Sequence, residues 1–517
     1  MIYKFDNEKI TFNDFFIKLN LIKTDKLKFS ISDRVLKKIN TEFEIIKNNL
    51  NSSVPVYGIN TGLGGNLNYK LQSNEVSNFQ DYIIKGRAVS AGNYLSQNIG
   101  LKTLLARCIQ TSRGKTGISP GLLKFFLKCL EEKIDPAIPE FGSIGSGDLT
   151  QNASFGLSLI GKGQVWQNNK IRNSKSLFKS LKLKAPEFEG KDAMVLINHS
   201  CLSLALSAQA LYQAKISLMM LQFSSLLSIE AFQANIKIFT PEINRLRHSP
   251  NQKECANWFY NILNSLKVTP RRIQDPLSFR TISVCHGLAI TNIKQSISYW
   301  ENELNSTTDS PVVLGKNKLY STPNFHNPAL SHSMESIMLS NTTISNGSVQ
   351  RMQRLMDSKL SGLNSYLSPV GGKSAGFAPS QKTAASILAE IRHLALPISF
   401  DASPVSDSVE DMSTMTPSSA KKLIKQSQLI KLISGMECLV ACQALDMRYE
   451  NVLNSKKISQ VTKNIWKNIR NSIDKISDDR PMENDINTSS LILEEFVKSN
   501  KTKNNLFFYR VEKWKLN

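Results

Sequence analysis

Two glycine-rich segments hold the residues whose types and spacing could do chemistry. The first, VPVYGINTGLGGN at residues 54–66, places Tyr57 in a β-rich stretch that leads into four glycines. The second, FGSIGSGDL at residues 141–149, has Ser146 with a glycine on each side. Glycine lets a backbone turn sharply and stay open to a ligand, and such loops often carry catalytic groups. The sequence therefore predicts a strand and a tight loop at Tyr57, and a second loop that meets it at Ser146.

Taken alone, the Gly-Ser-Gly triplet has a simpler interpretation. It is also typical of an ordinary tight turn before a helix, with Asp148 near the helix N-terminus, where a negative charge is favourable. The triplet alone does not distinguish a simple turn from a catalytic loop, so the other segments of the chain are needed.

Helical patterns predict the elements that must position these loops. Residues 199–233 contain neither glycine nor proline, which predicts one long helix. Gln209, Gln213, Lys215 and Gln222 recur through its middle, so a helix of a bundle is favoured over a membrane span. Further helical patterns cover residues 30–50, 122–133, 282–304, 328–360, 381–395, 420–451 and 490–497.

These patterns predict a mainly α fold with an elongated central helical bundle and a smaller mixed N-terminal domain that carries the active-site loops. We expect the N-terminal domain over residues 1–198, the bundle of long helices over 199–455 and a peripheral helical segment over 456–517. Of the 517 residues, 41% are hydrophobic and 21% are charged, a composition that is typical of a globular protein with a sizeable core.

Charge and cysteine usage exclude several classes of partner. The net charge of +22 comes from lysines spread along the chain, which favours a solvated basic surface over a nucleic-acid site. Seven cysteines without a CxxC pair favour a reducing compartment over disulfides or a metal site. The N-terminal residues lack the apolar stretch of a secretory signal. We therefore expect a cytoplasmic protein with no nucleic-acid, membrane or metal partner.

Seven segments, in order, resemble sequence blocks of the aromatic amino acid ammonia-lyase family. They are YGINTGLGG, GSIGSGDL, INHS, QDPLSFR, NSTTDSP, NFHNP and EDMSTM, and they span residues 57–415. The resemblance implies elimination of ammonia from an aromatic or polar α-amino acid, which gives the trans-α,β-unsaturated acid. It also implies a homotetramer whose active sites are shared between subunits.

The resemblance further implies a prosthetic group made from the chain itself. Members of the family form an electrophile, 4-methylidene-imidazol-5-one, by cyclising an Ala-Ser-Gly triplet with loss of water. The matching atoms here are the Gly147 nitrogen, the Gly145 carbonyl and the side chain of Ser146, which would lose its hydroxyl. The product would accept the substrate amine, and neither a metal nor an external cofactor is implied.

Other site residues follow from the same resemblance. Tyr57 matches the catalytic tyrosine, which needs nearby cations or donors to act as a base near neutral pH. Arg280 matches the arginine that holds the substrate carboxylate, and Glu410 matches the glutamate beside the amine. Four more positions match polar or aromatic residues of the site: Asn198, Gln274, Phe325 and Gln381.

The chain departs from the family pattern at several of these positions. GSIGSGDL is one residue shorter than the family block, with Gly145 in place of alanine. Leu277 replaces a second active-site tyrosine. His199 replaces a glycine, either as a packing residue or as a new acid or base. Arg87 stands where the family contacts the substrate side chain, and it would favour a polar or acidic side chain unless it points to solvent.

Two alternatives to an ammonia-lyase remain open. An aminomutase uses the same electrophile but returns the amine to the β-carbon. A degenerate member keeps the fold as a binding or assembly protein. This alternative is suggested by the short loop, by Leu277 and by Val409, which with Ser408 replaces the family's usual Asn-Gln pair before Glu410.

Overall fold

The computed structural model describes residues 1–50, 55–66, 68–71, 75–266, 268–316, 318–400 and 403–499. Within these ranges the chain forms nineteen α-helices and four two-stranded sheets, so the predicted mainly α fold is confirmed. The chain divides into two compact units. The first consists of Met1–Gln209, Ile297–His332 and Pro397–Lys421, and the second of Ala210–Ser296, Ser333–Leu396 and the residues from Lys422 onward.

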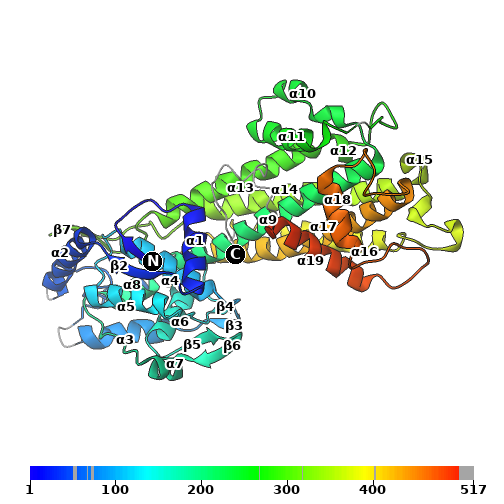
Figure 1. Ribbon diagram of the computed structural model, residues 1–517. Helices are drawn as coiled ribbons and strands as arrows, with labels where there is room; N and C mark the ends of the chain where they lie inside the picture. Colours follow the sequence, from blue (N-terminus) through cyan, green and yellow to red (C-terminus); the bar gives the residue numbers. More distant parts are fainter. Residues whose placement is uncertain are drawn as a thin grey trace. The chain divides into compact units, whose positions relative to one another are not determined.

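The first unit contains short helices and all of the described strands (Figure 1). Its helices are α1 (Phe12–Lys23), α2 (Asp33–Leu50), α3 (Val76–Arg87), α4 (Ile99–Thr111), α5 (Pro120–Glu131), α6 (Leu149–Leu159), α7 (Ser174–Leu181) and α8 (Asp192–Ile197), with the 3-10 helix η1 (Gly64–Asn66). The strands β1 (Ile2–Phe5) and β2 (Lys28–Ile31) pair in parallel. Three antiparallel pairs are β3 (Ala91–Tyr94) with β4 (Pro139–Phe141), β5 (Gln164–Gln167) with β6 (Lys170–Asn173), and β7 (Val312–Gly315) with β8 (Lys318–Tyr320).

Helix α4 forms the centre of the first unit, because every one of its residues is buried. Asp135 caps its N-terminus by accepting hydrogen bonds from the Asn98 and Leu101 nitrogens, at 2.6 and 2.9 Å. Its Arg107 pairs with Asp309 through two bonds of 2.8 and 2.7 Å, and both side chains are buried. The loop before β7 is therefore tied to the core helix.

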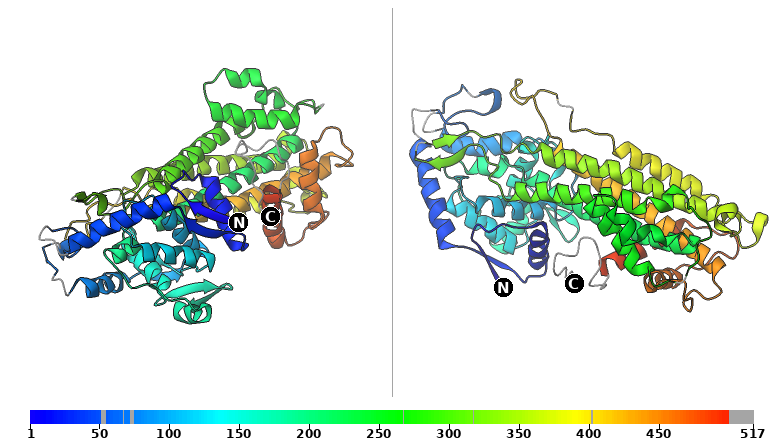
Figure 2. Two further views of the ribbon diagram at one scale, coloured as in Figure 1. Left: turned by 60° about the vertical axis from the view of Figure 1, so that its left-hand side comes forward. Right: turned by 90° about the horizontal axis from the view of Figure 1, so that it is seen from above.

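Four long helices contribute to both units: α9 (Cys201–Phe232), α13 (Ile282–Leu304), α14 (Pro328–Met356) and α17 (Thr416–Arg448). In the second unit α9, α14 and α17 lie side by side (Figures 1 and 2), and Glu437 of α17 bonds to both of the others. The other elements of this unit are η2 (Ile236–Phe239), α10 (Pro241–Arg245), α11 (Pro250–Leu263), α12 (Leu277–Arg280), α15 (Ser358–Ser361), η3 (Ser365–Leu367), η4 (Gly371–Lys373), α16 (Ser380–Leu394), α18 (Gln460–Arg470) and α19 (Glu483–Ser499).

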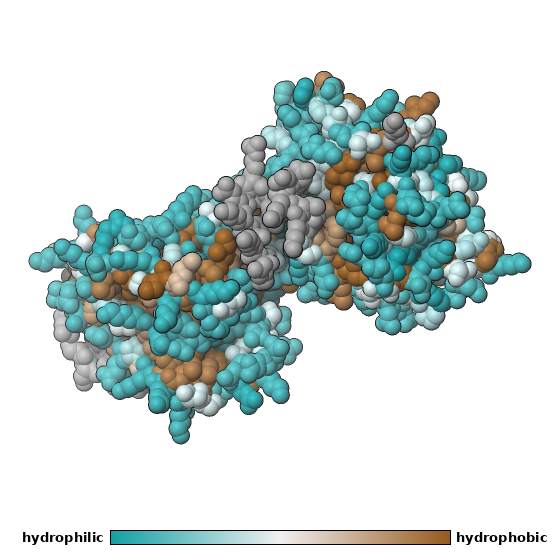
Figure 3. Space-filling model, viewed as in Figure 1, coloured by the Kyte–Doolittle hydropathy of each residue, from teal (hydrophilic) through white to brown (hydrophobic). Residues whose placement is uncertain are grey.

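Two helical stretches, residues 192–232 and 416–448, are long and apolar enough to cross a membrane by length and composition. In their most apolar windows, 94% and 78% of the residues are buried inside the protein. Such burial is that of core helices, which agrees with the bundle helix predicted over 199–233. The face drawn in Figure 3 is mostly hydrophilic, with hydrophobic groups between the polar ones.

Most predicted helices are confirmed within a turn of their expected bounds, and two differences have clear local causes. The helix predicted over 328–360 ends at Met356, because Asp357 is extended and its carboxylate accepts from the Lys359 and Leu360 nitrogens to start α15. The strand predicted before Tyr57 is not seen in the described residues of that segment. Asn60 instead folds back, with its side chain accepting from the Val56 nitrogen at 2.6 Å, and closes a turn.

Candidate active site

The loop around Ser146 has a backbone that requires glycine on both sides of the serine. Gly145 has φ +82° and Gly147 has φ +78°, conformations that other residues rarely adopt. A β-carbon on Gly145 would lie 2.1 Å from Thr414 Oγ1, and one on Gly147 would lie 2.6 Å from Asn198 Oδ1. Both separations are too short, so the loop fits tightly between Thr414 and Asn198.

Hydrogen bonds from distant segments hold this loop in place. The Ser146 hydroxyl, on a residue that is 9% exposed, donates to the Met412 carbonyl at 3.1 Å. Thr414 Oγ1 donates to the Gly145 carbonyl at 3.0 Å, and the Met415 nitrogen donates to the Ile144 carbonyl at 2.9 Å. The segment that follows Glu410 therefore lies along the Ser146 loop.

Asn198 and Phe325 lie against the same loop. A β-carbon on Gly147 would be 3.9 Å from Phe325 Cδ2, which places that ring beside the triplet. Asn198 is fixed by its Nδ2, which donates to the Ser310 carbonyl at 3.0 Å, next to the buried Asp309. The structure thus brings together the triplet and two of the residues predicted to surround it.

The loop fits the methylidene-imidazolone that the family pattern implies. Ring closure needs a small residue at 145, a glycine nitrogen at 147 and an enclosed serine side chain at 146. Gly145 has no room for a side chain, and the Ser146 hydroxyl is held by one carbonyl. Asn198 and Phe325 would line one side of such a ring.

Tyr57 and Arg87 interact electrostatically with each other, and the charge of Glu410 acts on both. The pKa of Tyr57 is raised, mainly by burial and also by the negative charge of Glu410. A backbone hydrogen bond with Gly64 and the positive charge of Arg87 lower it. Burial lowers the pKa of Arg87, while Tyr57 and Glu410 raise it. Arg87 is half-buried, and the charges that act on it are those of Tyr57 and Glu410.

The loops that carry Tyr57 and Glu410 are in contact. A β-carbon on Gly65 would lie 2.0 Å from Asp407 Oδ2, so the glycines after Tyr57 let the two loops approach closely. Glu410 closes its own loop through backbone bonds with Val405 and accepts from the Ser406 hydroxyl at 3.2 Å.

The remaining predicted residues belong to the second unit. Helix α12 begins at Leu277 and ends at Arg280, and Gln274 lies just before it. The exposed Arg280 donates from Nη1 to Gln274 Oε1 at 3.3 Å. Gln381 lies at the start of α16, where its Nε2 donates to the Met356 sulfur at 3.7 Å. These four residues belong to a different unit from Ser146 and Tyr57.

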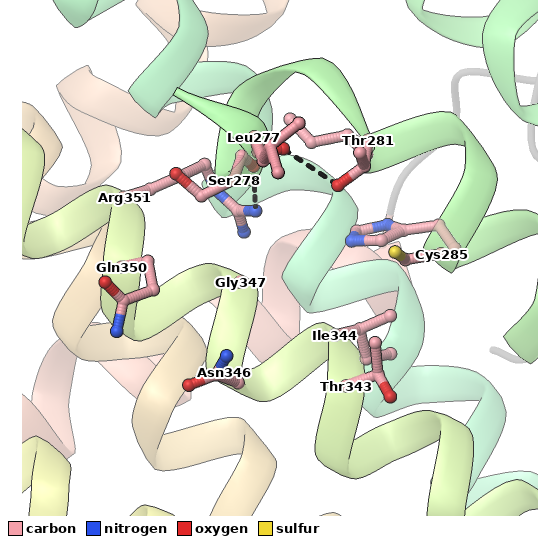
Figure 4. A pocket seen from close by; sticks show the side chains of 12 residues that line it. Leu277, Ser278, Thr281, Cys285, Thr343, Ile344, Asn346, Gly347, Gln350 and Arg351 are labelled. Carbon is pink, nitrogen blue, oxygen red and sulfur yellow. Dashed lines mark hydrogen bonds between the residues drawn. The ribbon is translucent and has the colours of Figure 1, made fainter. Parts of the chain in front are cut away.

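Leu277 opens onto a cavity of about 220 Å³ between α12, α13 and α14 (Figure 4). Ser278, Thr281 and Cys285 line one side, and Thr343, Asn346, Gln350 and Arg351 line the other. The Arg351 guanidinium donates to the Ser278 carbonyl at 3.1 Å. The cavity therefore lies where the tyrosine of the family pattern is replaced by leucine.

His286 also lines this cavity and was missed by the sequence interpretation. It is 1% exposed, and neither ring nitrogen has a hydrogen-bond partner among the described residues. Burial and the positive charge of Arg351 lower its pKa to about 3, so the ring is neutral. The only available signal was its place nine residues after Leu277, and a lone histidine in a helix is more often a packing residue.

His199 is a packing residue in this structure, one of the two interpretations left open by the sequence. The side chain is fully buried, its Nδ1 accepts from the Cys201 nitrogen at 3.2 Å and its Nε2 lies 3.1 Å from the Leu196 carbonyl. Burial lowers its pKa well below the ordinary value, so it stays neutral and shapes the start of α9.

Comparisons with known proteins cover almost the whole chain. A family model described as aromatic amino acid lyase matches residues 18–471. A probable histidine ammonia-lyase of Thermoplasma acidophilum is 30% identical over 479 residues, which are 90% of this chain and 94% of that protein.

Two solved structures have a similar fold. The ergothioneine-degrading enzyme ergothionase of Treponema denticola, in complex with desmethyl-ergothioneine sulfonic acid, matches with a TM-score of 0.90 and 25% identity over 96% of this chain and 99% of that one. Histidine ammonia-lyase of Trypanosoma cruzi matches with a TM-score of 0.85 and 25% identity over 96% and 94%.

Proposed function

Because the chain belongs to the aromatic amino acid lyase family, we propose that it eliminates ammonia from an aromatic or polar α-amino acid and releases the trans-α,β-unsaturated acid. The observation that carries the proposal is the glycine-flanked Ser146, enclosed by Asn198, Phe325 and the segment after Glu410. When residues 145–147 form the methylidene-imidazolone, that group supplies an electrophilic carbon that takes the amine and makes it a better leaving group.

Tyr57 is the base that removes the β-proton. It must be a phenolate to do so, and the neighbouring charge of Arg87 favours that form. Burial and Glu410 act in the opposite direction, and the pKa of Tyr57 is above its ordinary value. Activity should therefore rise toward alkaline pH. Glu410 interacts with the substrate amine.

Arg280 binds the substrate carboxylate. Its side chain is exposed and donates to Gln274 among the described residues, which leaves further guanidinium N–H groups for a bidentate pair. Gln274, Gln381 and Leu277 complete the wall around the substrate. As the family resemblance implies, we propose a homotetramer in which one subunit supplies these residues to the Ser146 loop of another.

Arg87 selects the substrate side chain. A guanidinium whose charge interacts with those of Tyr57 and Glu410 would favour a side chain with a hydrogen-bond acceptor or a negative charge over a phenyl ring. All seven cysteines are free thiols, which supports a cytoplasmic location.

Intact mass and ammonia release test the function together. We expect freshly purified protein to weigh two water molecules less than its sequence, and to release ammonia from a polar amino acid. Tyr57→Phe should keep the modified mass and lose ammonia release. β-Amino acid products in place of ammonia would identify an aminomutase, and an unmodified, inert protein would identify the degenerate alternative.

A second candidate is elimination without the electrophile, from a betaine whose trimethylammonium group leaves as a neutral amine. Two observations favour it: the loop is one residue shorter than the family block, and the chain resembles an ergothioneine-degrading enzyme over nearly its whole length. Tyr57 would still be needed as the base, but Ser146 would not. Release of trimethylamine from ergothioneine by Ser146→Ala, at the rate of the parent chain, would establish this candidate and exclude the first.

A further inference from the structure

We propose that Thr414 activates the Gly145 carbonyl for ring closure in the Ser146 loop. Thr414 is 1% exposed, and its Oγ1 donates to the Gly145 carbonyl oxygen at 3.0 Å. That carbonyl carbon is the atom that the Gly147 nitrogen must attack. The inference rests on the proposed function, because it concerns how the electrophile is made.

The surrounding side chains direct the Thr414 proton toward this carbonyl. Thr414 Oγ1 also lies 2.8 Å from Thr416 Oγ1 and 3.3 Å from Asn327 Oδ1, and Thr416 Oγ1 lies 2.7 Å from Asn327 Oδ1. The Thr414 and Thr416 hydroxyls have one proton each, which is too few to make every one of these contacts a hydrogen bond in addition to the bond to Gly145. The Asn327 amide also hydrogen-bonds the Glu303 carboxylate, which holds its nitrogen on that side and its oxygen toward Thr416, so the Thr416 proton goes to Asn327 Oδ1.

With this orientation the Thr414 proton is left for the Gly145 carbonyl. The Thr416 hydroxyl donates to Asn327 Oδ1, the Thr416 nitrogen donates to Thr414 Oγ1 at 3.4 Å, and the Thr414 hydroxyl donates to the Gly145 carbonyl. Hydrogen bonds in such a network strengthen one another in a buried environment. Thr414 is therefore poised to stabilise negative charge on the Gly145 oxygen, as a donor of an oxyanion hole does.

The step balances with these groups alone. The lone pair of the Gly147 nitrogen forms a bond to the Gly145 carbonyl carbon, and the carbonyl π electrons move onto oxygen. That oxygen takes the Thr414 proton, and Thr414 regains the proton that leaves the Gly147 nitrogen. Water then departs with the Ser146 amide proton, and a carbon–nitrogen double bond forms. A second water leaves with the Ser146 hydroxyl and α-proton, which forms the methylidene without an oxidant or reductant.

The same contact explains the residue at position 145. A methyl group there would lie 2.1 Å from Thr414 Oγ1, so an alanine side chain and the Thr414 hydroxyl compete for one space in this backbone. Glycine leaves that space to the hydroxyl. The presence of glycine instead of the family's alanine at position 145 therefore goes together with the hydrogen bond from Thr414 to the carbonyl of that residue.

Three variants test the role of Thr414 by mass rather than by activity. Thr414→Val keeps the shape and removes the donor, Thr414→Ser restores the donor, and Thr103→Val removes a buried hydroxyl that donates only to the helical Ile99 carbonyl among the described residues. Each variant is made by cell-free synthesis, and the loss of two water molecules is followed by intact mass over time. We expect Thr414→Val to mature about a hundredfold more slowly, with Thr414→Ser and Thr103→Val close to the parent chain.

The outcomes separate this inference from the proposed function. Thermal unfolding and circular dichroism identify any variant that fails to fold, and Thr414→Ser then carries the comparison. A modified parent chain with equally fast maturation of folded Thr414→Val would overturn the role of Thr414 and leave the function intact. An unmodified parent chain would overturn both.

Discussion

At the scale of single residues, the ionisation of Tyr57 depends on two neighbours of opposite charge. Arg87 lowers the pKa of the phenol and Glu410 raises it, while burial raises it most. In the proposed site, the three side chains would therefore couple substrate selection to the base. A change in Arg87 would alter both the proposed pocket and the fraction of Tyr57 that is a phenolate.

Substitution of either neighbour should move the Tyr57 titration in a predictable direction. Loss of the positive charge in Arg87→Gln destabilises the phenolate and should raise the pKa of Tyr57. Loss of the negative charge in Glu410→Gln should lower it. The ultraviolet difference spectrum against Tyr57→Phe, recorded as a function of pH, measures each shift without turnover. Shifts in the same direction for both variants would contradict this arrangement.

Gly145 gives a second prediction at this scale. Gly145→Ala restores the family residue, yet it should destabilise the protein, because φ is +82° and the methyl group would meet Thr414. The matched control is Gly371→Ala, where φ is +68° and nothing lies within 4 Å of a β-carbon. We expect about 1 kcal/mol for Gly371→Ala from the left-handed backbone and a larger loss for Gly145→Ala. Equal losses in urea unfolding would show that the contact with Thr414 costs nothing.

At the scale of helices, one carboxylate ties three of the long helices together in the second unit. Glu437 of α17 accepts from Ser224 and Ser228 of α9, at 2.7 and 2.8 Å, and pairs with Arg351 of α14 at 2.6 Å. Arg351 and Glu437 are 1% and 0% exposed. A buried charge with this many partners fixes the register of the helices, although it need not add net stability.

Removal of that carboxylate should be costly. Glu437→Gln leaves the buried Arg351 without a counter-charge, so we expect a loss of roughly 3–5 kcal/mol in the free energy of unfolding. The control is Glu254→Gln, which breaks a surface pair with Lys294 at 2.6 Å and should cost about 0–1 kcal/mol. Similar losses for the two variants in urea unfolding would mean that Arg351 is well solvated.

The long helices could be predicted from the sequence because their signal is local. Residues 282–304 form α13 with the predicted bounds, since apolar periodicity and the absence of breakers both mark a helix. The family pattern likewise predicted that Asn198 and Phe325 would surround the Ser146 loop. The contact of Thr414 with Gly145 joins residues 269 positions apart, and no local pattern encodes that pairing. His286 was missed for the same reason, because its cavity is made by three separate helices, α12, α13 and α14.

At the scale of the whole molecule, the proposed site residues are divided between the two compact units. Tyr57 belongs to the first and Arg280 to the second. Subunit mixing tests whether one site draws them from different chains. Tyr57→Phe and Arg280→Gln should each be inactive alone, and random reassembly of the two should restore about a quarter of the parent activity, because half of the subunits supply each intact residue.

The control for this mixing is Tyr57→Phe reassembled with the double variant Tyr57→Phe/Arg280→Gln, which has no intact tyrosine and should remain inactive. Native mass spectrometry of the same mixtures reports the subunit number. Full exchange of subunits without recovery of activity would show that each site is completed within one chain, and would contradict the shared-site proposal.

The hydrogen bonds that shape the Ser146 loop also determine when, during translation, the loop can reach its final conformation. The loop leaves the ribosome before both of its partners. The Met412 carbonyl that accepts from the Ser146 hydroxyl lies 266 residues further along, and the Thr414 hydroxyl that donates to the Gly145 carbonyl lies 269 residues after Gly145. A nascent chain cannot give the loop its final shape until Thr414 has emerged. Under the proposed function, ring closure at Ser146 would therefore wait until Thr414 has emerged, so translation products that stop before that residue would be released without a reactive site.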